Sequence, residues 1–80
     1  MTTIQRLVGY DRATELVAEE FPVAPDKLPK ARQLARVPAD DPEVTGCYPL
    51  SAEEARELGW ILEARVDPDH RDYFLEGFAS

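Results

Sequence analysis

The segment Leu50–Ala55 carries the strongest local structure signal in the chain, because it sets the start of a helix. The Ser51 hydroxyl can accept a hydrogen bond from the backbone N–H of Glu54, while the Glu54 carboxylate reaches back to the N–H of Ser51. This capping box satisfies two of the backbone donors that the first turn of a helix leaves unpaired. We therefore expect a helix to begin at Ser51.

The end of this helix determines the rest of the fold, and two alternatives are open. In the first, the helix ends at Leu58, Gly59 takes the left-handed C-terminal position, and residues 60–66 alternate as a strand. In the second, Ala55, Leu58 and Leu62 share one face of a longer helix. Gly59 and the turn-forming residues that follow favour the first alternative.

The first half of the chain predicts a hairpin and then a helix. Residues 4–10 alternate as a strand, and residues 15–21 return as its antiparallel partner. The next segment, Asp26 to Arg36, predicts a helix with Asp26 as its N-cap. Pro29 is tolerated there because the first turn of a helix has no partner for its missing N–H.

The remaining segments complete an expected ββααββ order. Residues 37–47 contain two prolines and a glycine and predict a loop, whereas residues 73–78 predict the last strand. We therefore expect one small α+β domain over residues 1–80. Its four-stranded, mainly antiparallel sheet would be covered by two helices on one face. A chain of 80 residues leaves no room for a second domain.

The net charge of −7 lies in the second half of the chain. Residues 1–40 contain six acidic and six basic side chains, whereas residues 41–80 contain ten acidic and three basic ones. A phosphate backbone or an anionic membrane surface would repel such a protein. We therefore expect no nucleic-acid or membrane partner, and the charge favours another protein with a basic surface.

Few side chains are candidates for catalysis or metal binding. Cys47 is the only cysteine and His70 the only histidine, which is too few soft ligands for a zinc site. We expect a packed thiol at Cys47 and a surface histidine at His70. The acids Asp40, Asp41 and Glu43 lack the spacing of a calcium-binding loop. We therefore expect no metal site, no cofactor and no enzymatic activity.

The expected location is the cytoplasm. A single cysteine allows no intramolecular disulfide, which fits a reducing compartment. The N-terminal residues lack the apolar run of a signal peptide, and the longest uninterrupted apolar stretch is residues 60–62. A stretch of that length is far too short to span a membrane.

The aromatic residues of the second half suggest a binding surface. On the last strand Tyr73 and Phe74 point to opposite faces, so both faces carry large rings. A sheet with helices on one side buries one face, and the other set of rings stays partly exposed unless residues 37–49 cover it. Buried rings anchor partners, and charges around them steer association. The predicted partner-binding residues are Asp67, Asp69, Asp72, Glu76, Trp60, Phe74 and Phe78.

Several short motifs resemble a family of short, uncharacterised bacterial proteins. They are Asp41-Pro42, Cys47-Tyr48-Pro49-Leu50, the capped helix at Ser51 and Tyr73-Phe74-Leu75-Glu76. The resemblance covers most of the chain from Gly9 onward. It implies packing roles for these motifs, no catalytic residue, and an immunity or accessory role beside a larger protein.

Our leading hypothesis is a non-enzymatic acidic interaction module that binds a basic surface on another protein, in an immunity-like, accessory or regulatory role. Two other classes stay open. One is a regulatory domain that binds a small ligand or metal through residues 40–48. The other is a structural homodimer that pairs through a sheet face or an edge strand.

Overall fold

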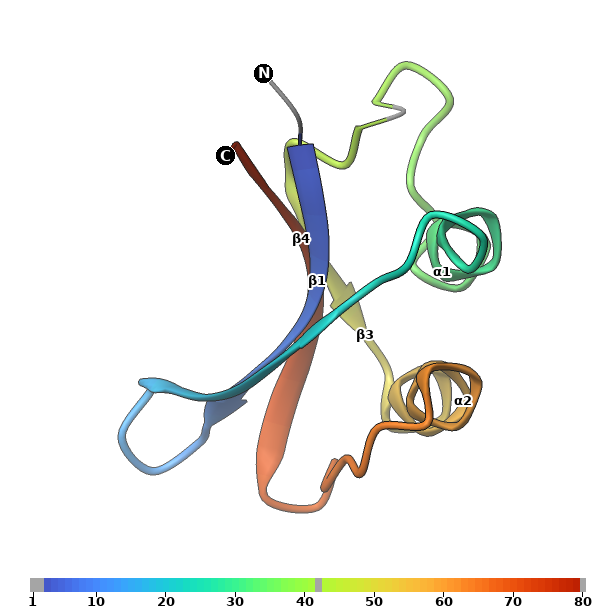
Figure 1. Cartoon of the computed structure of the whole chain (residues 1–80). Helices are drawn as coiled ribbons and strands as arrows, with labels where there is room; N and C mark the ends of the chain where they lie inside the picture. Colours follow the sequence, from blue (N-terminus) through green and yellow to red (C-terminus); the bar gives the residue numbers. More distant parts are fainter. Residues whose placement is uncertain (1–2, 42, 80) are drawn as a thin grey trace.

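The first and last strands of this protein are neighbours at the centre of one antiparallel sheet (Figure 1). The computed structural model describes residues 3–41 and 43–79. Its six elements are β1 (Thr3–Asp11), β2 (Val17–Pro22), α1 (Leu28–Leu34), β3 (Cys47–Leu50), α2 (Ala52–Leu62) and β4 (Arg71–Ala79). The strand order is β2-β1-β4-β3, and all neighbouring strands are antiparallel.

Both helices lie on one side of the sheet, and no helix covers the other side (Figure 1). The predicted α+β class, with four antiparallel strands and two helices on one face, is therefore confirmed. The predicted order ββααββ is wrong, because the structure has the order β-β-α-β-α-β. The third strand precedes the second helix instead of following it.

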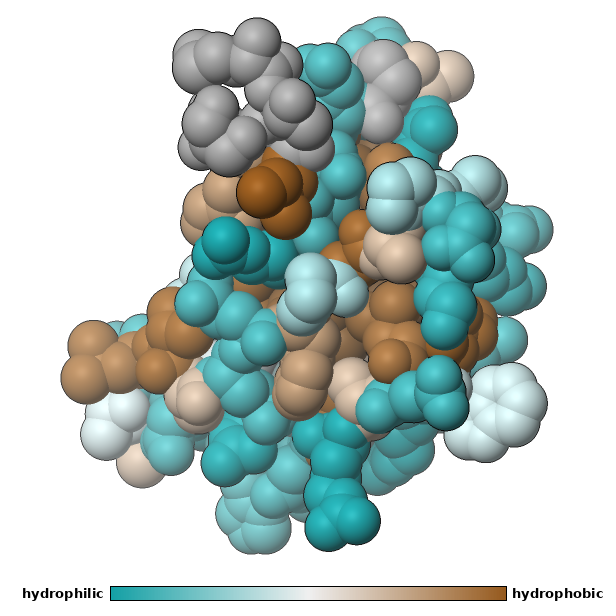
Figure 2. All heavy atoms as spheres, in the orientation of Figure 1, coloured by the Kyte–Doolittle hydropathy of each residue, from teal (hydrophilic) through white to brown (hydrophobic). Residues whose placement is uncertain are grey.

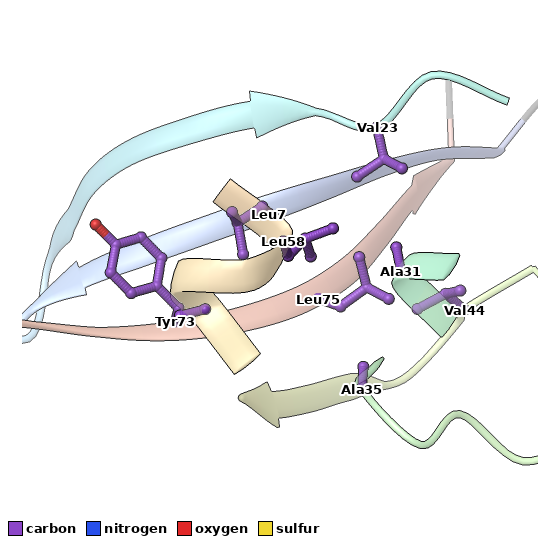
Figure 3. Packing of buried hydrophobic residues seen from close by; sticks show 9 residues of the cluster. Leu7, Val23, Ala31, Ala35, Val44, Leu58, Tyr73 and Leu75 are labelled. Carbon is purple, nitrogen blue, oxygen red and sulfur yellow. The ribbon is translucent and has the colours of Figure 1, made fainter. Parts of the chain in front are cut away.

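The core lies between the sheet and the helices. Leu7 of β1 is paired in register with Leu75 of β4, and both are fully buried. Leu58 of α2 lies close to Leu7 on the helix side of these strands (Figure 3). The small side chains of Ala31 and Ala35 allow α1 to pack closely, and both alanines are buried in the same cluster.

The α2 helix begins as predicted but ends later. The capping box is present, with Glu54 N–H donating to Ser51 Oγ at 3.1 Å and Ser51 N–H donating to Glu54 Oε1 at 2.9 Å. The helix then continues through Leu62, and Glu63 takes the left-handed C-cap position with φ 56°. The predicted strand over residues 60–66 is therefore wrong.

Gly59 is needed for close packing within α2, and it does not end the helix. A Cβ at this position would lie 3.0 Å from the methyl groups of Val66 and 3.1 Å from the carbonyl oxygen of Ala64. The chain that leaves α2 therefore folds back against the helix at the place where a side chain is missing. Gly59 therefore does mark a position with a special requirement. The requirement is space for Val66 and Ala64, and it is not a left-handed helix end.

The strand β3 occupies a segment whose start was predicted as loop. Tyr48 and Leu50 pair in register with Leu75 and Tyr73, so their side chains share the helix-covered face and pack against the core. Pro49 is tolerated because β3 is an edge strand, where a missing N–H need not remove a ladder hydrogen bond.

The α1 helix is shorter than predicted. It covers Leu28–Leu34, and its N-cap residue is Lys27, whose side chain makes no capping hydrogen bond. Asp26 is therefore not the cap that the sequence suggested. Pro29 does lie in the first turn, as expected from its missing N–H.

The segment between α1 and β3 packs onto the helix-covered face of the sheet. Val44 is fully buried, and a Cβ on Gly77 of β4 would lie only 2.1 Å from the Val44 carbonyl oxygen. The Gln5 side chain donates to the carbonyl oxygen of Glu43 at 2.9 Å. This segment therefore fills the inner side of the sheet and leaves the outer face uncovered.

Asp41 organises this segment. Its carboxylate accepts hydrogen bonds from the N–H and hydroxyl of Thr45, at 2.8 and 2.7 Å, and from the N–H of Gly46 at 3.2 Å. The Tyr48 hydroxyl donates to the same carboxylate. The pKa of Asp41 is held well below its usual range, chiefly by the Tyr48 hydrogen bond and then by those from Thr45.

We predict that Gly77→Ala strongly destabilises the protein. The new Cβ would collide with backbone atoms of residues 43 and 44, which cannot move aside as a side chain can. Overpacking of this kind costs about 3 kcal/mol of unfolding free energy. Gly59→Ala is the comparison, and we expect a smaller loss there. Its Cβ would come no nearer than 3.0 Å to the Val66 methyls and 3.1 Å to the Ala64 carbonyl oxygen, and a helical alanine gains about 1 kcal/mol. Urea unfolding measures both, and equal losses would contradict the close approach at Gly77.

We predict that Asp41→Asn reduces stability at pH 7 more than at pH 3. A carboxylate with a lowered folded-state pKa stabilises fully above its unfolded pKa of about 4, and this stabilisation falls as the pH drops below that value. Urea unfolding at the two pH values tests the difference. Asp40→Asn removes the adjacent charge, and we expect it to leave stability nearly unchanged at both.

Candidate binding surface on the uncovered sheet face

The sheet face opposite the helices carries partly exposed aromatic and apolar side chains. Strand alternation and register place on it the side chains that we call the uncovered face: Ile4, Arg6, Val8, Tyr10, Glu20, Cys47, Pro49, Asp72, Phe74, Glu76 and Phe78. Ile4 is exposed, Phe74 and Phe78 are half-buried, and Val8 is buried between its register partners Phe74 and Glu20. This open sheet face is the candidate binding surface of the protein.

Aromatic contacts order the centre of this face. The rings of Tyr10 and Phe74 meet edge to face, with centroids 5.5 Å apart and planes at 83°. The guanidinium carbon of Arg6 lies 4.9 Å from the centroid of the Phe78 ring. Arg6 also pairs with Glu20 at 3.3 Å. These contacts hold both phenylalanine rings on the surface in defined positions.

A hollow of about 320 Å³ opens beside the Tyr10–Phe74 pair, at the end of the sheet where β1 turns into β2. We call it the hairpin hollow. Its lining residues are Tyr10, Asp11, Arg12, Glu15, Cys47, Asp72 and Phe74. Aromatic walls with several carboxylates nearby are suited to a group that is apolar along its length and positively charged at its end.

Glu76 accepts two hydrogen bonds beside this hollow. The Tyr10 hydroxyl donates to Glu76 Oε2 at 2.6 Å, and the Cys47 thiol donates to the same oxygen at 3.2 Å. The hydrogen bond that Tyr10 donates to Glu76, together with burial, raises the pKa of Tyr10 to about 12. Partial desolvation of the sulfur and the hydrogen bond to Glu76 raise the pKa of Cys47 to about 11. Both groups are therefore protonated at neutral pH.

The predicted packed thiol is wrong, because Cys47 is exposed on the uncovered face. Its strand position points it away from the helices and toward Glu76. His70 is exposed in the turn before β4, as predicted, and its Nδ1 lies 2.9 Å from Asp67 Oδ2. Cys47 pairs in register with Glu76, about 20 Å along β4 from His70 at ~3.3 Å per residue. The two residues therefore cannot form a catalytic pair.

The structure brings together four of the seven predicted binding residues. Asp72, Phe74, Glu76 and Phe78 lie on the uncovered face. Trp60 does not join them, because it lies on α2 in the helix layer, where its side chain is 83% exposed. It borders a separate open hollow with two cationic residues, Lys27 and Arg65. Trp60 therefore cannot anchor the same partner surface.

The predicted steering acids already have partners within the protein. Asp72 pairs with Arg12 at 2.9 Å, and Asp69 pairs with Arg56 at 3.3 Å. Asp67, like Asp69, belongs to the turn between α2 and β4, where it contacts His70. These exposed pairs reduce the local field of each acid, although the net charge of the chain stays at −7.

Sequence reasoning missed the contribution of the first hairpin to this surface. Tyr10, Asp11, Arg12 and Glu15 line the hairpin hollow together with Asp72 and Phe74. Strand alternation did place Tyr10 on the same face as Ile4 and Val8. No local signal showed that β1 and β4 are neighbours, and only that pairing brings the two sets of residues together.

The described residues contain no group of three or more histidine, cysteine or acidic side chains that could hold a metal ion. Within residues 40–48, the Asp41 carboxylate already accepts hydrogen bonds from Thr45 and Gly46 of the same segment. Within the same part of the chain, neither helix has the length and apolar character needed to cross a membrane.

Comparison with known proteins identifies a family of unknown function. Residues 4–76 match the family described as Domain of unknown function (DUF7683). This match covers β2, β3, both helices and most of the two central strands, and it ends before Phe78 of the uncovered face. Neither a curated protein nor a solved structure matches the chain.

We predict that Cys47 reacts slowly with iodoacetamide at pH 8 although it is exposed, because its raised pKa keeps the reactive thiolate scarce. Glu76→Gln removes the negatively charged acceptor, so the pKa of Cys47 should fall and alkylation should accelerate about ten-fold per unit. Glu20→Gln removes a charge from the same face and serves as the control. Rapid alkylation of the unmodified protein would contradict the Cys47–Glu76 contact.

Proposed function

This chain belongs to the DUF7683 family, whose function is unknown, and from its uncovered face we propose that it is a non-enzymatic interaction module. In this proposal, the uncovered face binds a positively charged surface on another protein. The observation that carries the proposal is a sheet face without a helical cover, on which partly exposed aromatic rings lie among carboxylates.

The apolar part of the surface supports protein binding. Ile4, Phe74 and Phe78 expose apolar area on the uncovered face, and the β1–β2 hairpin adds Leu16 and Val17, which are 69% and 51% exposed. Figure 2 shows hydrophobic side chains on the side of the molecule that faces away from the helices. Exposed apolar area on a small domain is typical of interaction sites.

The charge of the chain supports a basic partner. A net charge of −7 on 80 residues attracts a positively charged surface from a distance and repels an acidic one. Long-range attraction raises association rates, and salt weakens it because the Debye length is about 8 Å at physiological ionic strength. The partner we propose is therefore a basic protein whose association rate falls as salt is added.

An immunity-like, accessory or regulatory role in the bacterial cytoplasm fits this picture. Such a role needs a small, stable domain with one good binding surface. The exposed Cys47 with a free thiol fits a reducing compartment. Resemblance to short bacterial proteins that accompany larger ones supports the same role.

A structural homodimer is the second candidate, and the ion pairs of the uncovered face favour it. Arg6 pairs with Glu20, and Arg12 pairs with Asp72, so the surface presents both signs of charge near its apolar residues. A two-fold interface requires a self-complementary surface of this kind. Light scattering from low to moderate salt separates the candidates. A dimer at every salt concentration would support self-association and contradict an outside partner.

We predict that a basic protein captured from cell lysate binds this protein through the uncovered face. Binding of that purified protein should fall by more than ten-fold when Phe74 and Phe78 are both changed to Ser, because interface anchors carry most of the affinity. Trp60→Ser, on the helix side, should leave binding unchanged. Surface plasmon resonance measures the affinity and the association rate at each salt concentration.

A second variant guards against misfolding of the double serine protein. It replaces four acids by their amides and leaves the apolar residues in place. The changes are Asp67→Asn, Asp69→Asn, Asp72→Asn and Glu76→Gln. We expect this variant to associate more slowly and with less salt dependence. Salt-insensitive binding, or binding that these four changes leave unaltered, would contradict the proposal.

A further inference from the structure

We propose that the hairpin hollow receives one long cationic side chain, an arginine or a lysine, from the binding partner. This inference rests on the proposed function and deepens it by naming the chemical group that the surface recognises. It depends on the aromatic walls of the hollow, the charges at its rim and its size.

The walls are suited to a cationic side chain with an apolar stem. Tyr10 and Phe74 both line the hollow, and their rings meet edge to face at 83°. Aliphatic stems of lysine and arginine pack against such rings while the charged end stays hydrated. An aromatic face also attracts the cation directly through its quadrupole.

The rim has an excess of negative charge. Asp11, Glu15 and Asp72 border the hollow, and the one cation among the lining residues is Arg12. The Arg12 guanidinium is already bound, to Asp72 at 2.9 Å and to the carbonyl oxygens of Pro68 and Asp69 at 2.7 and 2.9 Å. Arg12 therefore neutralises Asp72. The Asp11 carboxylate accepts hydrogen bonds from the N–H groups of Ala13 and Thr14 at 2.7 and 3.2 Å, which leaves Glu15 as the rim acid free to meet a ligand.

Glu15 is the rim carboxylate best placed to meet a cation. It takes part in none of the ion pairs that the described residues form, and its side chain is exposed. Its backbone is held in the left-handed region at φ 61°, and its N–H donates to the Asp11 carbonyl oxygen at 2.7 Å. The turn therefore fixes where the Glu15 side chain leaves the backbone.

The size and polarity of the hollow exclude other ligand classes. A volume of about 320 Å³ is at the small end for organic ligands and cofactors, and the hollow is open to solvent. Phosphates and carboxylates would be repelled by Glu15 and Asp11 and would meet an arginine whose charge is already shared with Asp72 and two carbonyl oxygens. A single positively charged side chain that projects from a protein surface meets neither obstacle.

Nuclear magnetic resonance titration of the ¹⁵N-labelled protein tests this inference with three small probes. Nα-acetyl-arginine amide and Nα-acetyl-lysine amide carry the proposed groups, and Nα-acetyl-norleucine amide is the neutral control. We expect the cationic probes to shift the amide signals of residues 10–16 and 72–74. The probe with the lower Kd identifies the preferred side chain.

Two charge-matched variants sharpen the titration. Glu15→Gln and Glu57→Gln each remove one negative charge, but Glu57 is an exposed residue of α2 on the helix side. We expect Glu15→Gln to raise the Kd of the cationic probe about two- to five-fold, the range expected for one exposed charge contact. Glu57→Gln should leave the Kd unchanged. Phe74→Leu keeps the site apolar, and loss of its ring should also weaken binding.

Several outcomes would overturn the inference. These are equal shifts from the norleucine probe, shifts centred on α2, or equal effects of the two glutamate variants. The inference and the proposed function can fail separately. A partner that needs Phe78 but ignores Glu15→Gln and added arginine probe would overturn the hollow and retain the interaction module. If the probes bind at the hollow but the protein forms only dimers, the hollow would be retained and the outside-partner function overturned.

Discussion

The antiparallel pairing of β1 with β4 is the constraint on which the rest of the structure depends. The two strands pair without a break from Thr3 with Ala79 to Asp11 with Arg71. All the other helices and strands belong to the segment that connects these two strands. A register slip of one residue would move Leu7 or Leu75 from the core to the uncovered face. Two glycines help to fix the register, because Gly9 lies against the Tyr73 ring and Gly77 against the Val44 carbonyl.

This pairing also explains why one sheet face stays open. Residues between β1 and β4 add β2 on one edge and β3 on the other, and both helices lie on the same side. The segment before β3 is drawn to that side too, because Val44 is buried there against Gly77. Nothing in the described chain is left to cover Phe74 and Phe78. The candidate binding surface is thus a consequence of the topology.

Sequence predicted the features whose causes are local. The capping box of Ser51 and Glu54 involves atoms three residues apart, and alternation along the last strand put Phe74 and Phe78 on one face. Gly59 wrongly predicted a helix end. Glycine is required there because Val66 packs against the helix, and no local pattern reveals that contact. The hairpin hollow was missed for the same reason. Tyr10 and Phe74 are far apart in sequence and become neighbours only through the central strand pair.

The charges of this surface have two separate effects on recognition. The individual acids near the sheet are largely paired, as Asp72 is with Arg12 and Glu20 with Arg6, so they contribute little local specificity. The net charge of −7 is unaffected by these pairs and acts over the whole molecule. In the proposed function, attraction of a basic partner would therefore come from the whole chain, whereas selection among basic partners would require a defined contact. The hairpin hollow, with its aromatic walls and Glu15 at the rim, is where such a contact can be made.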